Sequence, residues 1–179
     1  MKKLLLFPLL FLALQTVAQK KITTTNGSIT FEASVPVFEE VKAINTAVTC
    51  TITLENSELI CKANMRAFVF KKELMQDHFN RYYIESDRYP QAHFTGIIEK
   101  FDLKNVPETP TSYQIKGKLK IHGRTKNISI IAVLQKTKMG IVLDSQFDLN
   151  TDDYGIVIPN VIIAKISKTV ATQLHFVLN

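Results

Sequence analysis

The sequence has few of the residues that mark linkers or nucleic-acid-binding tracts. Six glycines and six prolines are spread over 179 residues, and we find no repeat, no low-complexity tract and no Gly/Ser-rich linker. The Lys and Arg residues occur singly or in pairs such as Lys71-Lys72, which gives a nucleic-acid-binding role little support. HExxH, CxxC and GxSxG patterns are also missing, so no common catalytic motif indicates an enzyme.

The first residues have the layout of a secretory signal peptide. Lys2 and Lys3 precede an apolar run of eleven residues, and small residues lead to a cut before Gln19. An uncleaved anchor is the alternative, but the run is shorter than the ~20 residues of a membrane-spanning helix. Because no cysteine lies near the cut, a lipid-anchored protein is not indicated. We therefore predict a signal peptide over residues 1–18 and one domain over residues 19–179.

Removing the signal lowers the net charge from +6 to about +4. This charge indicates ordinary solubility, with at most a weak attraction to an anionic membrane surface.

The chain contains two cysteines, Cys50 and Cys61. If a hairpin turn centres on Glu55-Asn56, the two cysteines face each other across an antiparallel pair, and such a pair can form a disulfide. Exported proteins meet oxidising conditions that favour the bond. A slip of two residues in the register would instead leave two buried thiols, and the sequence alone does not decide between these alternatives.

Alternation of apolar and polar residues dominates after residue 20 and favours β-strands. We predict strands over residues 29–31, after an Asn26-Gly27 turn, and over 48–54, 59–70, 92–101, 113–121, 128–134, 141–149 and 170–178. About eight strands joined by short turns predict an all-β fold, a single antiparallel β-barrel whose closure removes exposed edges. A two-sheet sandwich is the competing architecture.

One segment breaks the alternation. Between Lys71 and Tyr83, apolar side chains recur at helical spacing. Pro90 then favours an extended chain and the start of the next strand. We therefore expect one short helix between two strands, where it covers or plugs an end of the barrel.

Four stretches of the sequence carry a family resemblance. They are NGSITFEASVP (26–36), FKKELMQDHFNRYYIESDRYPQAHFTGII (70–98), GKLKIHGRTKNISI (117–130) and DDYGIVIPN (152–160). Together they resemble the YceI-like family of polyisoprenoid-binding, lipocalin-like periplasmic proteins. The resemblance implies a lipocalin- or streptavidin-like barrel with a long apolar cavity. It also implies storage or transport of an isoprenoid or quinone-like lipid in the bacterial envelope. The cysteine pair, and a tract at 65–70 that is apolar on both faces, depart from the family pattern.

An apolar ligand needs an apolar cavity with few polar groups. The predicted ligand-binding residues are Phe70, Leu74, Met75, Phe79, Tyr82, Phe94, Leu119, Ile121, Leu143, Phe147, Leu174 and Phe176. Core packing is the alternative role for each, since eight strands can be filled by side chains alone. Inward glycines at Gly96 and Gly117 favour a cavity. Arg124 and Lys126 are candidate contacts for an anionic head group, or else part of a solvated turn.

The four histidines are interpreted as surface or turn residues, with His93 and His122 facing outward or lying at a rim. No set of three convergent metal ligands can be assembled from the spacing. We therefore predict an exported, non-catalytic lipid-binding protein, periplasmic or secreted, without cofactor or metal. Its expected partner is an apolar lipid, with transient membrane-surface contact and a homodimer left open. The alternatives are an envelope enzyme acting on a hydrophobic substrate and a protein-interaction module with a filled barrel.

Overall fold

The computed structural model describes residues 20–179, and the predicted signal peptide at residues 1–18 lies outside this range. The strands are β1 (Lys21–Ser34), β2 (Lys42–Thr53), β3 (Glu58–Asn64), β4 (Val69–Phe70), β5 (Gln91–Ile98), β6 (Thr111–Ile121), β7 (Arg124–Thr137), β8 (Gly140–Asn150) and β9 (Ile166–Leu178). The short helical segments are η1 (Met65–Ala67), α1 (Glu73–His78), η2 (Phe79–Tyr83), η3 (Leu103–Asn105) and η4 (Thr151–Tyr154). None of the helices in this range is long and apolar enough to cross a membrane.

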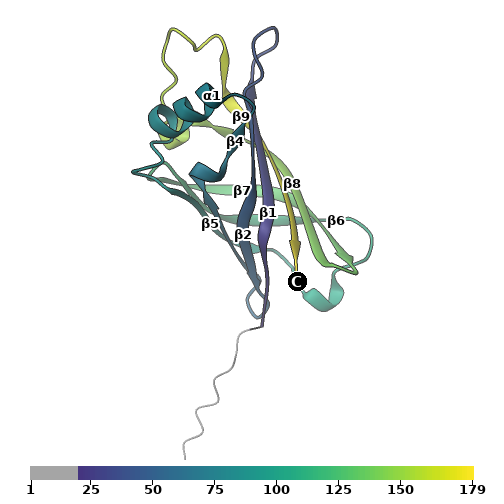
Figure 1. Cartoon of the computed structure of the whole chain (residues 1–179). Helices are drawn as coiled ribbons and strands as arrows, with labels where there is room; N and C mark the ends of the chain where they lie inside the picture. Colours follow the sequence, from purple (N-terminus) through teal and green to yellow (C-terminus); the bar gives the residue numbers. More distant parts are fainter. Residues whose placement is uncertain (1–19) are drawn as a thin grey trace, which may run out of the picture.

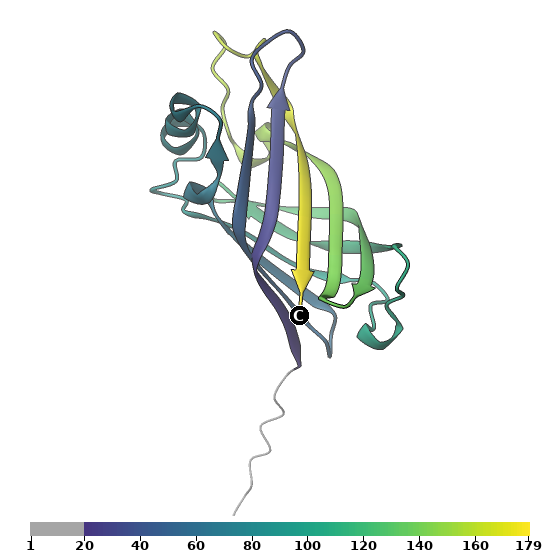
Figure 2. The ribbon, with the colours of Figure 1, turned by 45° about the vertical axis from the view of Figure 1, so that its right-hand side comes forward.

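The strands form a closed antiparallel barrel, which confirms the predicted fold class and excludes the sandwich (Figures 1 and 2). Neighbouring strands follow the order β1-β9-β8-β7-β6-β5-β3-β2, and β1 pairs with β2 to complete the ring. The short strand β4 also pairs with β2, beyond the stretch that β3 occupies. Closure joins these eight strands in a ring, so none of them is an edge strand of an open sheet.

Period-two alternation explains which side chains face inward. In β6 the residues Ile115, Leu119 and Ile121 point into the barrel, while the lysines between them are exposed. One half of the barrel is filled by fully buried side chains: Val48, Ile52, Ile98, Leu134 and Leu178. Because Leu178 is next to the last residue, this filled half lies at the end where the chain terminates, which Figure 1 marks with C. The hollow part is therefore confined to the opposite half.

The predicted Asn26-Gly27 turn is wrong, because β1 runs through it as one strand. The pairing of β1 with β2 shifts register on either side of Gly27, which marks a β-bulge. A Cβ atom at Gly27 would overlap the ring of Phe176. Glycine at this position allows the close approach of an aromatic ring. In the sequence alone, the same Asn-Gly pair looks like a turn.

The single strand predicted over residues 59–70 is also interrupted. After β3 the side chain of Asn64 accepts a hydrogen bond from the Arg66 backbone N–H at 3.0 Å and starts the 3-10 helix η1. The chain then rejoins β2 as β4. This change of direction buries Met65, Phe68 and Phe70 together. It accounts for the tract that is apolar on both faces.

Strands β7 and β8 separate towards the hollow end. They pair only through residues 132–137 of β7 and 140–145 of β8. At the last paired position the Ser145 hydroxyl donates to the Ile131 carbonyl at 2.7 Å. Beyond it, the 3-10 helix η4 packs against β7, β8 and β9. The motif DDYGIVIPN thus begins with a helical turn that fills a gap in the barrel wall.

Candidate functional site

A cavity of about 630 Å³ occupies the hollow half of the barrel. This volume falls within the roughly 300–1,000 Å³ of small-molecule sites. A barrel filled by side chains throughout, which the sequence left open, does not match this structure. Most of the predicted ligand-binding residues line the cavity: Phe70, Leu74, Met75, Phe79, Phe94, Leu119, Ile121, Leu143, Phe147, Leu174 and Phe176.

Tyr82 is the exception, and its predicted place in the cavity is wrong. It is 67% exposed, and its neighbour Tyr83 lines the cavity instead. The cause is the π-helical turn η2, in which the Ile84 N–H donates to the Phe79 carbonyl at 2.9 Å, five residues back. A π-turn holds one residue more than an α-turn, so the α-helical spacing assumed for Tyr82 does not apply.

Four phenylalanines form a cluster beneath the helical segment. They are Phe31, Phe68, Phe70 and Phe79, and five of their six pairs have ring centroids 5.1–6.0 Å apart. Aromatic pairs at such distances add to the stability gained from burial. Phe79 therefore anchors the segment to β1 and β4. Met75, one turn earlier, packs against the same core but is only partly buried.

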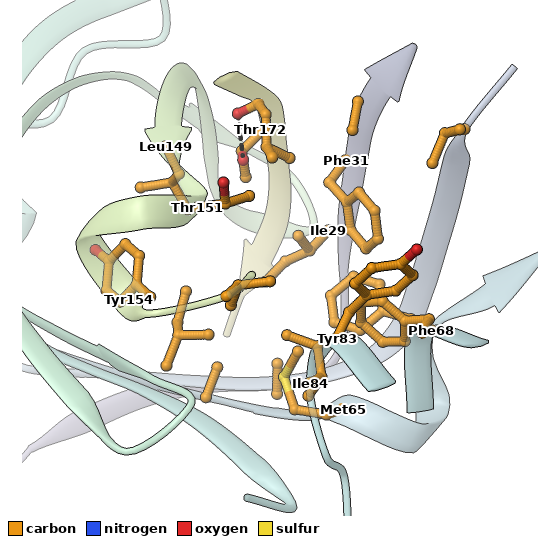
Figure 3. A pocket seen from close by; sticks show the side chains of 18 of the residues that line it. Ile29, Phe31, Met65, Phe68, Tyr83, Ile84, Leu149, Thr151, Tyr154 and Thr172 are labelled. Atoms are coloured by element: carbon orange, nitrogen blue, oxygen red, sulfur yellow. Dashed lines mark hydrogen bonds between the residues drawn. The ribbon is translucent and has the colours of Figure 1, made fainter. Parts of the chain in front are cut away.

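Sequence reasoning missed several wall residues. Ile29, Phe31, Met65, Phe68, Tyr83, Ile84, Leu149, Thr151, Tyr154 and Thr172 also line the cavity, and Figure 3 labels them. Alternation could have found Ile29, Phe31 and Leu149, since each has inward parity on a predicted strand. No sequence signal marks Thr151 or Tyr154, which reach the cavity through the η4 turn.

The mouth of the cavity lies between three segments. They are the connection between β1 and β2, the helix α1, and the loop between η4 and β9. Lys72 and Glu39 form an ion pair there, and Lys165 and His78 also line the opening. The charged groups among the lining residues are thus contributed by these mouth segments.

The uncharged polar side chains that line the cavity carry hydroxyls. Burial raises the pKa of Tyr83 above its ordinary value. Burial, together with the nearby Asp153 carboxylate, raises the pKa of Tyr154 to about 12. Both phenols are therefore uncharged at neutral pH, and the cavity offers apolar contact with a few uncharged hydrogen-bonding groups.

Arg124 and Lys126, the candidate head-group contacts, do not line the cavity. The Arg124 guanidinium packs on Gly155, where a Cβ atom would lie 2.5 Å from its Cζ. The Lys126 ammonium lies 2.8 Å from the Asp153 carboxylate. Both side chains therefore hold the η4 turn in place from outside the cavity, so the head-group interpretation is wrong for this structure.

His122 stands in the turn between β6 and β7, as the sequence analysis expected, but its side chain is only 13% exposed and does not face outward. Its ring nitrogens lie 3.1 Å from the Tyr154 carbonyl and 3.1 Å from the Glu85 carboxylate. Its ring also meets Tyr89 edge-on, with the centroids 4.7 Å apart. His122 thus connects the segment after η2 to the η4 turn.

Across residues 20–179, no group of three or more His, Cys, Asp or Glu side chains is arranged to hold a metal ion. His175 pairs with Asp144 on the outer surface, with 2.7 Å between Nδ1 and Oδ1.

The structure joins Cys50 and Cys61 in a disulfide between β2 and β3. They are directly opposed in the register, with Cα atoms 4.1 Å apart. This is the register expected from a turn centred on Glu55-Asn56. Cys50 is fully buried, and Cys61 lines the cavity. The bond therefore fixes part of the cavity wall.

A closed eight-stranded barrel with a one-ended apolar cavity defines a class of small-molecule-binding barrels. Comparison with known families identifies the member of this class: residues 20–178 match the YceI-like domain, and the chain belongs to that family. No curated protein matches the chain significantly.

Solved structures share the fold at low sequence identity. A polyisoprenoid-binding domain from Saccharophagus degradans, implicated in plant cell wall breakdown, superposes with a TM-score of 0.77 at 13% identity, covering 89% of this chain and 97% of that one. BcnA of Burkholderia cenocepacia gives a TM-score of 0.68 at 13% identity, with 84% and 94% covered. A YceI protein of Campylobacter jejuni gives 0.52 at 15% identity, with 73% and 79% covered.

Proposed function

We propose that this protein holds an isoprenoid or quinone-like lipid in its barrel, without catalysing a reaction, for storage or transport in the cell envelope. The observation that carries the proposal is the 630 Å³ apolar cavity, open at one end. Membership of the YceI-like family and the likeness to a polyisoprenoid-binding domain agree with it.

The hydrophobic effect supplies the affinity. Each 100 Å² of apolar ligand surface removed from water contributes about 2.5 kcal/mol. A prenyl chain enclosed by Phe31, Leu119 and Phe147 needs no charged partner to bind. This explains why a lipid-binding function leaves no catalytic motif in the sequence. The alternative, an envelope enzyme, needs convergent titratable groups beside its substrate. The charged groups that line this cavity stand at its mouth instead, which favours binding over catalysis.

The site of action we propose is the periplasm or the cell exterior, with cleavage of a signal peptide at residues 1–18. The support is the charge and apolar pattern of that segment. A Cys50–Cys61 disulfide agrees with an oxidising compartment.

The mouth of the cavity is the part that we propose contacts a bilayer. Val37, Leu74, Val157 and Val161 are 98%, 65%, 75% and 87% exposed, and they stand on the three segments around the mouth. Val37 also has a φ of 69°, which is unusual for a β-branched residue. Exposed aliphatic side chains on separate segments of the mouth suit shallow insertion among lipids, from which a water-insoluble ligand is taken up.

Binding of a prenylated quinone to the purified protein tests the proposal. Leu119→Trp places a bulky side chain in the cavity, and Lys118→Trp places the same side chain on the outer face of the same strand. We expect Leu119→Trp to lower the affinity at least tenfold and Lys118→Trp to leave it unchanged. Equal affinities in the two variants would place the binding site outside the barrel and contradict the proposal.

A further inference from the structure

One buried hydroxyl in the cavity has no hydrogen-bond partner. Thr151 is 8% exposed and lines the cavity, and its Oγ1 contacts no donor or acceptor of the protein. Its backbone carbonyl has a partner, since it accepts from the Ile156 N–H at 3.0 Å. A buried hydroxyl without a partner has lost its hydrogen bonds to water and gained none in return, so a ligand atom that bonds to it gains affinity.

The surrounding structure holds this hydroxyl in a fixed position. The Asn150 side chain accepts from the Asp152 N–H at 2.9 Å, and Gly155 ends the turn in the left-handed region. The Lys168 ammonium lies 2.9 Å from the Asp152 carboxylate. In addition, η4 packs against three strands of the barrel. Because these hydrogen bonds, ion pairs and packing contacts already fix the turn, the Thr151 side chain loses little conformational entropy when it binds a ligand.

A second hydroxyl lies on the same side of the cavity. Figure 3 draws Thr172 beside Thr151, across from Phe68 and Tyr83. The Thr172 hydroxyl donates to the Val170 carbonyl at 3.3 Å, so its oxygen remains able to accept a hydrogen bond. Thr151 can donate freely because its hydroxyl proton has no other acceptor. The two threonines together form a small uncharged polar site in an otherwise apolar wall.

We propose that Thr151 binds the uncharged, oxygen-bearing head of the lipid, a quinone carbonyl or a prenol hydroxyl, and that the cavity thereby disfavours prenyl diphosphates. This assignment rests on the proposed function and adds the class of head group. A diphosphate at Thr151 would be a buried charge without a counter-charge. Of the cations that line the cavity, Lys72 is paired with Glu39, and Lys165 stands at the mouth.

The test compares three ligands on the wild-type protein, Thr151→Val and Thr151→Ser. The ligands are a tetraprenyl quinone, geranylgeranyl diphosphate and squalene, a hydrocarbon without oxygen. Valine keeps the shape of threonine and removes the hydroxyl, so the fold is retained, and thermal unfolding checks this. We expect Thr151→Val to weaken quinone binding about three- to tenfold. Thr151→Ser should retain it, and squalene should bind all three proteins alike.

Each outcome decides a different point. If squalene and the quinone bind but Thr151→Val leaves the quinone affinity unchanged, the head-group assignment is wrong and lipid binding stands. Tighter binding of the diphosphate than of the quinone by the wild-type protein would also overturn the assignment. If none of the three ligands binds the wild-type protein, the proposed function fails, and the assignment fails with it.

Discussion

Gly96 and Gly117 lie directly opposite each other in β5 and β6, and the ring of Phe94 covers both. A Cβ atom on either glycine would lie 2.6 Å from Phe94 Cζ. The sequence suggested that these two inward glycines leave empty space, but the Phe94 ring occupies the space beside them. They let an aromatic ring lie flat against the wall, and the space in front of that ring belongs to the cavity.

The first prediction concerns this glycine pair. Gly117→Ala would press a methyl group against the Thr95 carbonyl and the Phe94 ring. We expect the free energy of unfolding to fall by about 1–3 kcal/mol in urea, as for other overpacked sites. Lys118→Ala, one residue away on the outer face, should change it by less than about 0.5 kcal/mol. Equal unfolding midpoints for the two variants would show that the ring can move aside.

The second prediction concerns the disulfide. Replacing Cys50 and Cys61 by alanine removes a cross-link that closes a short loop, so we expect a loss of roughly 2–3 kcal/mol of stability. Thermal unfolding of the wild-type protein with a reductant should show a comparable loss. The double variant provides the control, because a reductant should leave its unfolding temperature unchanged. An unaffected wild-type protein under full reduction would argue against a stabilising bond.

The third prediction compares two residues of the helical segment, one that mainly packs and one that mainly binds lipid. Phe79→Ser breaks the aromatic cluster and should destabilise the protein by about 3–5 kcal/mol. Met75→Ser changes a partly buried side chain that lines the cavity. It should cost little stability and weaken lipid binding several-fold. Thermal unfolding and lipid titration of both variants measure the two effects. Unfolding of Met75→Ser to the same extent as Phe79→Ser would show that the whole segment serves packing.

Alkaline stability should depend on Tyr154. Its pKa is raised to about 12, against about 10 in an unfolded chain. Between these values the unfolded state loses the phenolic proton and the folded state keeps it, so stability falls as the pH rises from about 10 to 12. Below pH 10 this contribution is fully present. Tyr154→Phe should show a shallower loss over that window in urea unfolding. Identical slopes in the two proteins would contradict the burial of the phenol.

The exposed aliphatic residues at the mouth should determine membrane binding. Val37→Asp combined with Val161→Asp should reduce co-sedimentation with phospholipid vesicles several-fold. Met139→Asp is the matched control, since Met139 is 68% exposed in the turn between β7 and β8, near the end where the chain terminates. If the control loses as much binding as the double variant, or the double variant loses none, contact through the mouth is wrong.

The barrel could be predicted because its signal is local. Alternation along β6 alone places Leu119 and Ile121 inward, and closure follows from the number of strands and their short turns. Several lining residues on long strands, such as Phe147 and Leu174, were found in the same way. The bulge at Gly27 and the break at Asn64 were not, because both depend on pairing with a distant partner strand.

The polar part of the site could not be predicted for a related reason. Thr151 stands in the polar tetrapeptide TDDY, whose composition indicates a solvent-exposed turn. It is buried because β7 and β8 separate and η4 fills the gap between them. Tyr83 lines the cavity in place of Tyr82 because of a π-turn, which likewise follows from tertiary packing rather than from local spacing.

The most direct test is mass spectrometry of an organic extract from the folded protein, produced with residues 1–18 in a bacterial host. We expect about one isoprenoid or quinone-like molecule per wild-type chain, and little or none from Leu119→Trp, whose cavity is filled. An empty wild-type protein that also fails to take up added polyprenyl lipids would contradict lipid binding in the barrel.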